Sequence, residues 1–430
     1  MHAKKPLSER TKVLVVGTTA DYIDWIRKSH PGRALFLTDP AIRSQARESA
    51  PSGEEEVLSD LADYDGAAGA LDAHLARLNL QLDGVAGYDC ESLELAAVLA
   101  VKYGLPFPPV VAVANSRNKY LSKKLWTATG LACPTACRVF STDDAARFFR
   151  EHGNPCVLKP VAGSGSELIF RCDSVPDCVT GFQAIADGLN KRRNSRMYTG
   201  QGGQPPEVLA ETLVQGDEYS CDFIIENGSI RIIRLTRKIL APGGAFGTAR
   251  GYLFPARLPE GIDASVLTDT IYRAAVALGI HRAICMLDFI IDRGQVVLLE
   301  MTPRPGGDCL PFLLRRCLNL DPLTLLLDFS QQRLGSLDLT VRPDCLPACI
   351  GLRLHASREG VLKRLDPGRL RRDKRVVAIH LIRTAGHRVV MPPADYDSWF
   401  LGHILFRPDQ SSGPAEQCQA LAEKLEVDFE

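Results

Sequence analysis

The stretch from Ala283 to Gly307 constrains the fold more than any other part of this sequence. Two nearly unbroken apolar segments flank Asp292-Arg293-Gly294, and each segment carries one internal acid, Asp288 or Glu300. The pattern is typical of a β-hairpin, and a three-residue loop with glycine in the left-handed position fits the spacing. In that register Asp288 faces Leu298, and Glu300 lies one diagonal away on the same face, roughly 7–8 Å between backbones.

Both acids of the predicted hairpin need a positive partner, because an unpaired carboxylate is costly to bury among apolar strands. Mg²⁺ is a suitable partner, since it binds one or two carboxylates together with substrate phosphates. A register shift of one residue would place the acids on opposite faces, so metal binding requires an odd loop length. The alternative is that Arg304 and Lys238 neutralise Asp288 and Glu300 as structural ion pairs.

A second motif places a lysine on a short strand, followed by a loop rich in glycine and serine. The sequence runs Cys156-Val-Leu-Lys159-Pro-Val-Ala-Gly163-Ser164-Gly165-Ser166. Glycines allow backbone N–H groups to turn toward a polyanion, and serine hydroxyls add donors. Lys159 would supply a compact positive charge for phosphate oxygens, but it precedes the glycines, so the motif is not a P-loop. A β-hairpin with a Gly-Ser turn and no ligand explains the same residues.

A third motif is an apolar strand with an isolated acid, Val208-Leu-Ala-Glu211-Thr212-Leu213. Gly216 then separates this strand from a second acid, Glu218. Glu211 is either exposed or bound to a partner, and Glu218 is placed to accept hydrogen bonds from ribose hydroxyls. Taken alone, the pattern also fits two surface acids beside a turn.

The first 115 residues alternate short apolar runs with amphipathic segments, which predicts a parallel, doubly wound α/β sheet. The expected strands cover Val13–Val16, Ala34–Leu37 and Gly84–Ala86, and the expected helices cover Asp21–Lys28, Asp65–Leu78 and Ser92–Tyr103. Gly17 stands without the other glycines of Gly-x-Gly-x-x-Gly, which argues against a dinucleotide site. The turn-rich segment Gly104–Pro109 is the predicted end of this domain.

The remaining residues divide into two further blocks, which agrees with two or three domains for 430 residues. The second block begins with a helix carrying Lys119, Lys123 and Lys124, and strands and hairpins then dominate to about residue 310. Its loops include a flexible segment, Lys191–Pro206, and a glycine-rich segment, Ala241–Gly251. The third block is α+β in character and closes with a helix over Pro414–Leu425.

Composition favours small-molecule partners over macromolecular ones. The 51 basic residues balance the 51 acidic ones, so there is no electrostatic signature of general nucleic-acid binding. No apolar run approaches the ~20 residues that span a bilayer, and no signal peptide is recognisable. We therefore expect a cytoplasmic protein. Its 13 cysteines include no Cys-x-x-Cys pair, so reduced thiols are expected rather than a zinc site.

Together, the motifs resemble the ATP-grasp superfamily in their order along residues 116 to about 310. That order is Lys119, Lys159 with its loop, Glu211, Glu218, Asp288, Glu300 and Arg304. The resemblance implies a pre-ATP-grasp α/β domain at 1–115 and an ATP-grasp domain at 116–320 with a mobile small lid at about 140–215. It also implies a C-terminal α+β subdomain at 321–430.

The resemblance implies a role for each nucleotide-binding residue. Lys119 and Lys159 would contact the α- and β-phosphates, and the Gly163–Ser166 loop would close over the triphosphate. The strand Glu211–Leu213 would meet adenine through its side chain and backbone amides, while Glu218 would bind ribose.

The resemblance also implies the metal ligands and the reaction. Asp288 and Glu300 would hold one or two Mg²⁺, with Mn²⁺ as a substitute, and Arg304 would contact the γ-phosphate. Many members have asparagine as a further metal ligand where this chain has Thr302, which weakens the case for a second ion. A substrate carboxylate would attack ATP to give an acyl phosphate, and an amine would then displace phosphate to form an amide.

Among family members, the chain looks most similar to amino-acid ligases that make dipeptides or amides. Its partners would be a small carboxylate and an amine, with a homodimer as one open option and with neither nucleic acid nor membrane. A purine-pathway-like ligase or carboxylase is an alternative, for which Arg231, Arg234, Arg237 and Lys238 could supply a basic cluster. A non-catalytic ATP-binding sensor is the other, and Thr302 is the feature that favours it.

Overall fold

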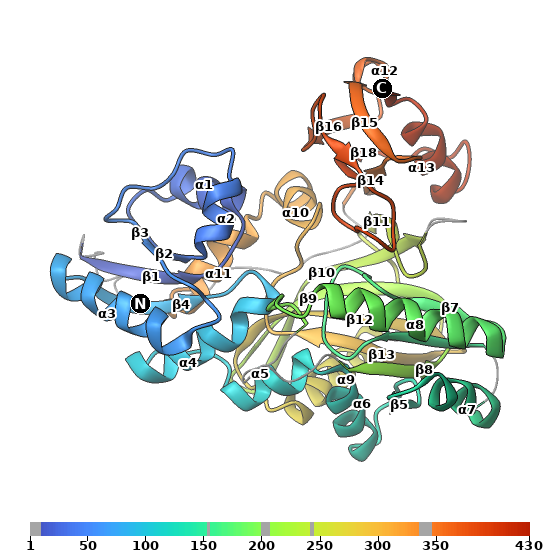
Figure 1. The fold of residues 1–430 in the computed structure, drawn as a ribbon, viewed down its shortest axis with the longest axis horizontal. Coiled ribbons are helices and arrows are strands. Elements are labelled where there is room, and N and C mark those ends of the chain that lie inside the picture. The colour runs from blue at the N-terminus through green and yellow to red at the C-terminus, as the bar shows by residue number, and fades with distance from the viewer. Residues whose placement is uncertain (1–9, 153–154, 199–206, 241–244, 335–345) are drawn as a thin grey trace.

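The computed structural model describes residues 10–152, 155–198, 207–240, 245–334 and 346–430. Parts of the two predicted loops, Lys191–Pro206 and Ala241–Gly251, lie outside these ranges. Figure 1 shows three regions: an N-terminal α/β region, a central region of long strands, and a C-terminal group of strands. No helix within the described ranges is long and apolar enough to cross a membrane.

The N-terminal region is a parallel sheet with the strand order β3-β2-β1-β4. Its strands are β1 (Thr11–Val16), β2 (Ala34–Thr38), β3 (Glu56–Leu58) and β4 (Gln81–Ala86). Its helices are α1 (Ala20–Ser29), α2 (Pro40–Gln45), α3 (Tyr64–Leu78) and α4 (Leu93–Tyr103), with a short 3₁₀ helix η1 (Cys90–Ser92). The predicted strands and helices are thus confirmed, and α2 and β3 are additions.

Helices cover both faces of this sheet, as a doubly wound fold requires. Helices α3 and α4 pack on one face, where Leu14 and Leu35 lie in their core cluster. Helix α1 packs on the other face together with α11 (Pro322–Ser330), which returns from much later in the chain. The predicted boundary near residue 320 groups α11 with the C-terminal block, whereas its apolar residues belong to the core of the N-terminal sheet. The domain boundaries themselves stay predictions.

The central region is an antiparallel sheet of eight strands in the order β13-β12-β9-β10-β11-β14-β18-β16. The strands are β9 (Asp217–Glu226), β10 (Ser229–Leu240), β11 (Ala249–Phe254), β12 (Ala283–Asp292), β13 (Gln295–Thr302), β14 (Cys349–His355), β16 (Val376–Leu381) and β18 (Phe400–Phe406). Helices α5 (Val110–Arg117), α6 (Lys119–Ala128) and α9 (Ala264–Ala277) form its core with Phe223 and Leu287. The sheet therefore continues into the C-terminal strands without interruption.

A smaller sheet with the strand order β5-β8-β6-β7 lies beside the central sheet. Its strands are β5 (Ala136–Val139), β6 (Cys156–Pro160), β7 (Phe170–Cys172) and β8 (Val208–Thr212). Helices α7 (Thr142–His152) and α8 (Val175–Lys191) pack on it and share its apolar core. This unit corresponds in position to the small lid expected at about 140–215; its mobility stays a prediction.

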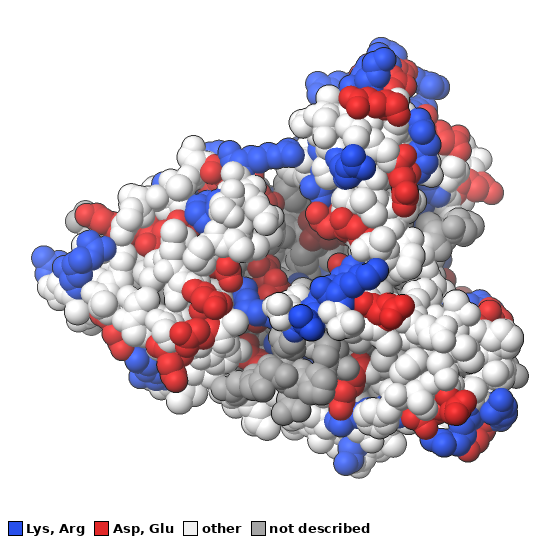
Figure 2. Space-filling model, in the orientation of Figure 1, with Lys and Arg blue, Asp and Glu red and all other residues white. Residues whose placement is uncertain are grey.

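The C-terminal strands are completed by a three-stranded sheet in the order β17-β15-β19. Its elements are β15 (Gly360–Asp366), β17 (Arg388–Val389), β19 (Glu426–Phe429), α12 (Gly368–Arg371) and α13 (Pro414–Ala422). Helix α10 (Leu310–Leu318) packs on β14 and connects this part to the centre. Figure 2 shows a hollow between the C-terminal strands and the N-terminal region, with acidic and basic side chains interspersed over the visible face. The predicted fold class, α/β followed by α+β, is confirmed.

The β12–β13 hairpin forms as predicted, but its register differs. Asp292 pairs with Gln295, so the loop has two residues, Arg293 and Gly294, and both have positive φ. This geometry is typical of a type I′ turn. The predicted three-residue loop is therefore wrong.

A bulge corrects the effect of this even-numbered loop. The register shifts between Asp288 and Phe289, so that Phe289 faces Leu298 while Asp288 faces Glu300 directly. Leu299 is the extra residue of the bulge. The two acids are thus direct cross-strand partners rather than diagonal neighbours, which brings them closer than predicted.

Candidate active site

A cavity of about 530 Å³ lies between the small sheet and strands β9, β10, β12 and β13 of the central sheet. This volume is in the range of cavities that hold small ligands and cofactors. Most of the predicted site residues line it: Lys119, Lys159, Gly163, Ser164, Ser166, Glu211, Thr212, Leu213, Glu218, Asp288 and Glu300. Gly165, Thr302 and Arg304 lie outside this lining.

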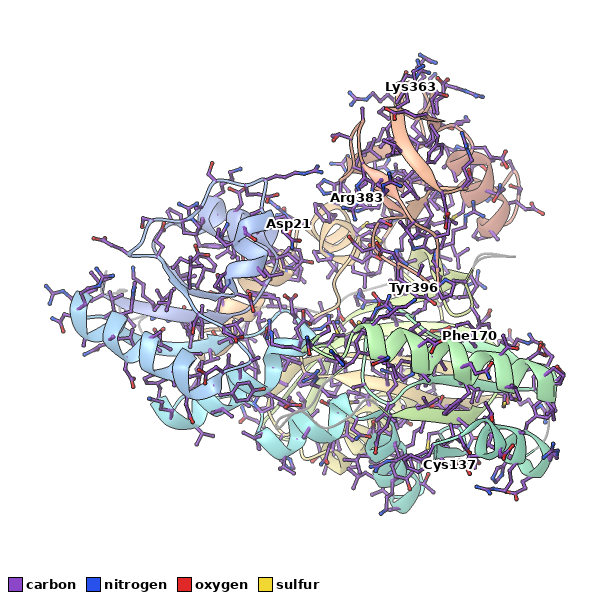
Figure 3. The ribbon with its side chains drawn as sticks, in the orientation of Figure 1. Asp21, Cys137, Phe170, Lys363, Arg383 and Tyr396 are labelled. Atoms are coloured by element: carbon purple, nitrogen blue, oxygen red, sulfur yellow. The ribbon has the colours of Figure 1, made fainter. Side chains whose placement is uncertain are left out.

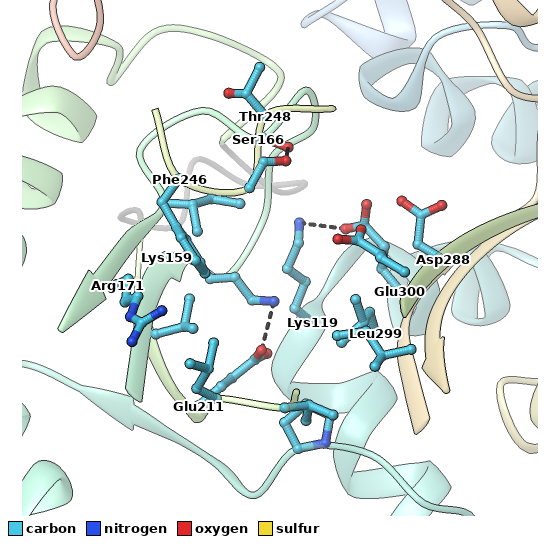
Figure 4. A pocket seen from close by; sticks show the side chains of 18 of the residues that line it. Lys119, Lys159, Ser166, Arg171, Glu211, Phe246, Thr248, Asp288, Leu299 and Glu300 are labelled. Atoms are coloured by element: carbon cyan, nitrogen blue, oxygen red, sulfur yellow. Dashed lines mark hydrogen bonds and ion pairs between the residues drawn. The ribbon is translucent and has the colours of Figure 1, made fainter. Parts of the chain in front are cut away.

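On the small-sheet side, Glu211 is held between two lysines, Lys159 and Lys123; Figure 4 shows its contact with Lys159. Its carboxylate lies 2.7 Å from Lys159 Nζ and 2.7 Å from Lys123 Nζ, and all three side chains are buried. Lys159 comes from β6 and Glu211 from the neighbouring strand β8, while Lys123 comes from α6. Glu211 is therefore bound rather than exposed, and its side chain fixes Lys159 at the edge of the cavity.

On the opposite wall, Lys119 links the glycine-rich loop to the central sheet. Its Nζ donates a hydrogen bond to the Gly163 carbonyl at 2.7 Å and lies 3.4 Å from Glu300 Oε2. Asn118 caps α6, since its side chain accepts hydrogen bonds from the backbone amides that begin the helix. Lys119 is thus held at the first turn of a firmly anchored helix, between the loop and a candidate metal ligand.

Lys238 bridges the other two acids of the cavity. Its Nζ lies 2.6 Å from Asp288 Oδ2 and 2.6 Å from Glu218 Oε1. The ion-pair alternative is therefore correct for Lys238 and Asp288. It is wrong for Arg304, because Lys119 pairs with Glu300, whereas Arg304 donates to Cys90 Sγ at 3.1 Å and to the Pro305 carbonyl.

The loop after β6 has the conformation expected of an anion-binding turn. Gly163, Gly165 and Ser166 all have positive φ. Gly163 has a φ of +136°, which favours glycine, and a Cβ there would also crowd the Tyr198 ring at 3.0 Å. Ser166 Oγ donates to the Gly247 carbonyl at 2.8 Å and so joins this loop to the second glycine-rich segment.

The strand end that was expected to meet adenine already uses its amides within the protein. The Thr212 amide donates to Thr135 O at 3.0 Å, and the Leu213 amide donates to Pro155 O at 3.2 Å. These bonds fix the strand end at the mouth of the cavity. Contacts between this strand and adenine stay a prediction.

A second, small cavity of about 20 Å³ lies on the far side of Lys119 and Glu300. Thr302 lines it together with Cys90, from η1 of the N-terminal region, and Ser116, from α5. Arg304, bonded to Cys90, therefore lies next to this small cavity. Glu300 lines both cavities, as do Lys119 and Gly163.

The charged groups of the main cavity shift one another's pKa values. Burial alone would raise the pKa of Glu300, but Lys119, Lys159, Lys238 and Lys123 lower it to about 2. Burial would lower the pKa of Lys238, but Asp288 and Glu218 raise it well above its ordinary value. Both groups are therefore charged at neutral pH.

Lys123 does not line the cavity itself but pairs with Glu211, which does. Burial lowers its pKa to about 8, although Glu211 opposes this shift. It was predicted as a helix residue and not as a site residue. The available signal was its position four residues after Lys119, which places both on one face of a helix.

The paired acids meet a simple requirement for a hard divalent cation. Asp288 and Glu300 face each other across two strands and offer oxygen ligands, which Mg²⁺ prefers. Asp288 Oδ1 is buried and lacks a hydrogen-bond partner among the described residues, a costly arrangement unless another ligand satisfies it. The residues therefore fit a Mg²⁺ ion at this position.

Comparison with known proteins identifies the central part of the chain. Residues 152–311 match the family described as "ATP-grasp domain". A D-alanine–D-alanine ligase of Acidovorax ebreus is 27% identical over 214 residues, covering 47% of this chain and 59% of that protein. The dapdiamide A synthase of Enterobacter agglomerans is 24% identical over 206 residues, covering 48% and 46% respectively. The chain thus spans about half to three fifths of the length of these relatives.

The fold extends the likeness to the whole chain. The crystal structure of an L-amino acid ligase from Bacillus licheniformis superposes with a TM-score of 0.75 at 18% identity, covering 98% of this chain and 99% of that one. The predicted resemblance is confirmed: residues 152–311 form an ATP-grasp domain, and this range contains all of the predicted cavity-lining residues except Lys119.

Proposed function

We propose that the protein is a Mg·ATP-dependent ligase that joins a carboxylate to an amine, forming an amide or dipeptide and releasing ADP and phosphate. The observation that carries the proposal is the pairing of Asp288 with Glu300 beside four lysines that line or border one cavity. The names of the relatives, ligases and a synthase, support the same reaction class.

In this proposal the cations bind the phosphates of ATP. Lys119, which is bonded to the Gly163 carbonyl, and Lys159 contact the α- and β-phosphates, while the Gly163–Ser166 loop supplies backbone N–H groups. Glu218, beside Lys238, accepts hydrogen bonds from ribose. The strand Glu211–Leu213 borders the adenine.

Asp288 and Glu300 would hold one Mg²⁺, which would supply positive charge for the phosphoryl group during transfer. The buried, unpartnered Asp288 Oδ1 supports this role, and so does the low pKa of Glu300, which keeps that ligand ionised. Thr302 lines the small cavity rather than the main one. We therefore propose one firmly held ion. That Thr302 also binds a metal ion stays a prediction.

The chemistry then has two steps. An oxygen of the substrate carboxylate forms a bond to the γ-phosphorus as the bond to the β-phosphate oxygen breaks, giving an acyl phosphate and ADP. The amine attacks the acyl carbon, phosphate leaves, and the amine proton passes to solvent. Arg304, at the small cavity, steadies the negative charge of the phosphoryl group during the first step. Substrates would reach Glu300 from the side of the small cavity, toward the N-terminal region.

ADP release across pairs of amino acids tests the proposal. We expect ATP turnover that requires both a carboxylate and an amine, with a coupled product of the expected mass. Hydroxylamine in place of the amine should trap the acyl phosphate as a hydroxamate. Asp288→Asn should abolish turnover, whereas Asp292→Asn, at the exposed end of the same strand, should retain it.

The other outcomes support the alternatives. Turnover only with phosphorylated nucleotide precursors would indicate the purine-type ligase or carboxylase. ATP binding without turnover under any condition would indicate a sensor. Either result would contradict the proposed reaction. A cytoplasmic location and a homodimer stay predictions.

A further inference from the structure

Three thiols meet in the apolar core of the small sheet, whose strands β6 and β7 also carry the cavity-lining residues Val157 and Arg171. Cys156 lies on β6, Cys172 on β7 and Cys178 on α8. Cys156 and Cys172 are direct cross-strand partners, and Cys156 Sγ lies 3.8 Å from Cys178 Sγ. All three sulfur atoms lie within 4.8 Å of one another, and all three residues are buried.

This arrangement is singular within the described part of the chain. There, it is the one group of three or more His, Cys, Asp or Glu side chains whose ligand atoms approach this closely. Its members are too widely spaced in the sequence to form a recognisable zinc motif, which is why the sequence predicted separate reduced thiols. A buried cysteine on its own behaves as a small apolar residue, so the question is whether the geometry fits more than packing.

The distances match a metal ion bound by thiolates. A zinc–sulfur bond is about 2.3 Å, so two sulfurs on one ion are about 3.8 Å apart in a tetrahedral site and about 4.0 Å apart in a trigonal one. The observed Cys156–Cys178 distance of 3.8 Å equals the first value. The upper limit of 4.8 Å for the remaining pairs exceeds the trigonal edge by about 0.8 Å, a shift that side-chain rotation can supply.

The surroundings favour a soft ion. Phe170, labelled in Figure 3, lies on β7 beside α8, and it packs with Leu158 in the same apolar cluster as the three thiols. A Cβ at Gly181 would lie 3.3 Å from Phe170 Cβ and 3.6 Å from Cys172 Sγ, so α8 approaches the thiols closely. Thiolate ligands in such a setting select thiophilic ions over hard ones such as Mg²⁺.

We propose that Cys156, Cys172 and Cys178 form a binding site for one thiophilic d¹⁰ metal ion, either Zn²⁺ or Cu⁺. Each thiol that binds the ion loses its proton to solvent as its metal–sulfur bond forms, and no electron is transferred. The ion would tie β6, β7 and α8 together. Because Lys159 follows Cys156 on the same strand, the ion would stabilise the strand that presents this lysine to the cavity. The site does not depend on the proposed ligase reaction.

The test is a metal titration of the full-length, reduced, metal-free protein under anaerobic conditions. Cd²⁺ serves as the spectroscopic probe, through its ultraviolet thiolate-to-metal absorption, and Zn²⁺ and Cu⁺ are then compared by competition. We expect saturation at one ion per chain, together with a higher melting temperature. Increased hydrogen-exchange protection should be confined to β6, β7 and α8.

Matched variants assign the site. Cys178→Ala should abolish the equimolar step and the stabilisation, whereas Cys285→Ala, which alters a buried thiol on β12, should retain both. If Cys178→Ala does not fold, Cys172→Ser takes its place, with circular dichroism as the check. Unchanged binding in the folded variant, or the absence of a saturable step in the unaltered protein, would overturn the proposal. A reductant-reversible loss of two thiols, instead of metal binding, would also overturn it and would indicate a disulfide.

Discussion

The buried ion pair between Asp222 and Arg234 supports the segment that carries Arg304, and its removal has a calculable cost. Asp222 is on β9 and Arg234 on β10, and their side chains are 1% and 0% exposed. Two hydrogen bonds of 2.8 Å join the carboxylate to the guanidinium, and Asp222 Oδ1 also accepts the Gly306 amide at 3.0 Å. Gly306 follows Arg304 by two residues. The Asp222 carboxylate therefore holds both the Arg234 side chain and the segment that carries Arg304.

Asp222→Asn removes the negative charge with little change of shape. Two unit charges about 4 Å apart interact by roughly 4 kcal/mol at an effective dielectric constant of 20. Removing one partner of a buried pair typically costs about 3–5 kcal/mol, because the other charge is left uncompensated. We therefore expect a loss of about 3–5 kcal/mol in the local stability of β9 and β10. We also expect a fall in the kcat for ADP formation that exceeds any rise in the KM for ATP, because Arg304 loses its anchor.

The same two strands provide the matched control. Asp217 and Arg237 also pair between β9 and β10, but at 3.5 Å and with side chains 59% and 34% exposed. An exposed pair of this kind contributes about 0.2–1 kcal/mol, so Asp217→Asn should have little effect. Hydrogen exchange of β9 and β10 peptides, measured against urea concentration, gives both opening free energies. Equal losses in the two variants, within about 1 kcal/mol, would refute the reasoning.

Two further predictions concern Gly216, which lines the main cavity, and Asp89, which directly precedes Cys90 of the small cavity. Gly216→Ala should cost about 1–3 kcal/mol of stability and weaken ATP binding in calorimetry, because φ is +133° and the new Cβ would lie 2.1 Å from Ile291 O. Gly228→Ala is the control: its φ is +74° and the space around it is open, so ATP binding should be unchanged. Equal affinities for ATP in the two variants would contradict the prediction. Burial, followed by the charge of Glu91, raises the pKa of Asp89 to about 7, so the folded state retains a proton that the unfolded state loses above about 3.9. Stability should therefore fall as pH rises from about 4 to about 7, and Asp89→Asn should raise the melting temperature at pH 8 but not at pH 4; a gain of equal size at both values would count against the shifted pKa.

Local patterns were sufficient to predict the N-terminal fold and the main elements of the site. In the N-terminal sheet, runs such as Val13–Val16 are buried on both faces, and the amphipathic segments between them form the covering helices. The order of the lysines and acids along residues 116 to about 310 was enough to predict that most of them line one cavity. These features depend on side-chain periodicity and motif order, both of which are visible in a single sequence.

The register of the β12–β13 hairpin, which carries Asp288 and Glu300, could not be predicted, because it depends on hydrogen-bond partners outside the hairpin. The bulge at Leu299 turns its carbonyl toward Lys123 Nζ, which donates to it at 2.8 Å, while the Leu298 amide donates to Ala132 O at 2.8 Å. Both partners come from α6 or the segment just after it. The prediction that metal binding requires an odd loop length was therefore wrong, although Asp288 and Glu300 still face each other.

The side chains that pair with the acids of the cavity could not be predicted from the sequence pattern either. Lys238 was expected to neutralise one of the two hairpin acids, but not to bridge Asp288 and Glu218. Glu211 was left as exposed or bound. Lys159 reaches it from the neighbouring strand β6, and Lys123 reaches it from α6. Contacts of this kind join strands and helices that are far apart in the chain, so no local pattern encodes them.

The most direct test of the account is Mg²⁺-dependent ADP formation by Glu300→Gln. The variant keeps the size of the side chain but removes one of the two charges that face each other across β12 and β13. We predict that ADP formation is abolished at all Mg²⁺ concentrations, while the circular dichroism spectrum and the chain's hydrogen-exchange pattern are retained. ADP formation equal to that of the unaltered protein, with the same Mg²⁺ dependence, would contradict the assignment of Asp288 and Glu300 as the metal ligands.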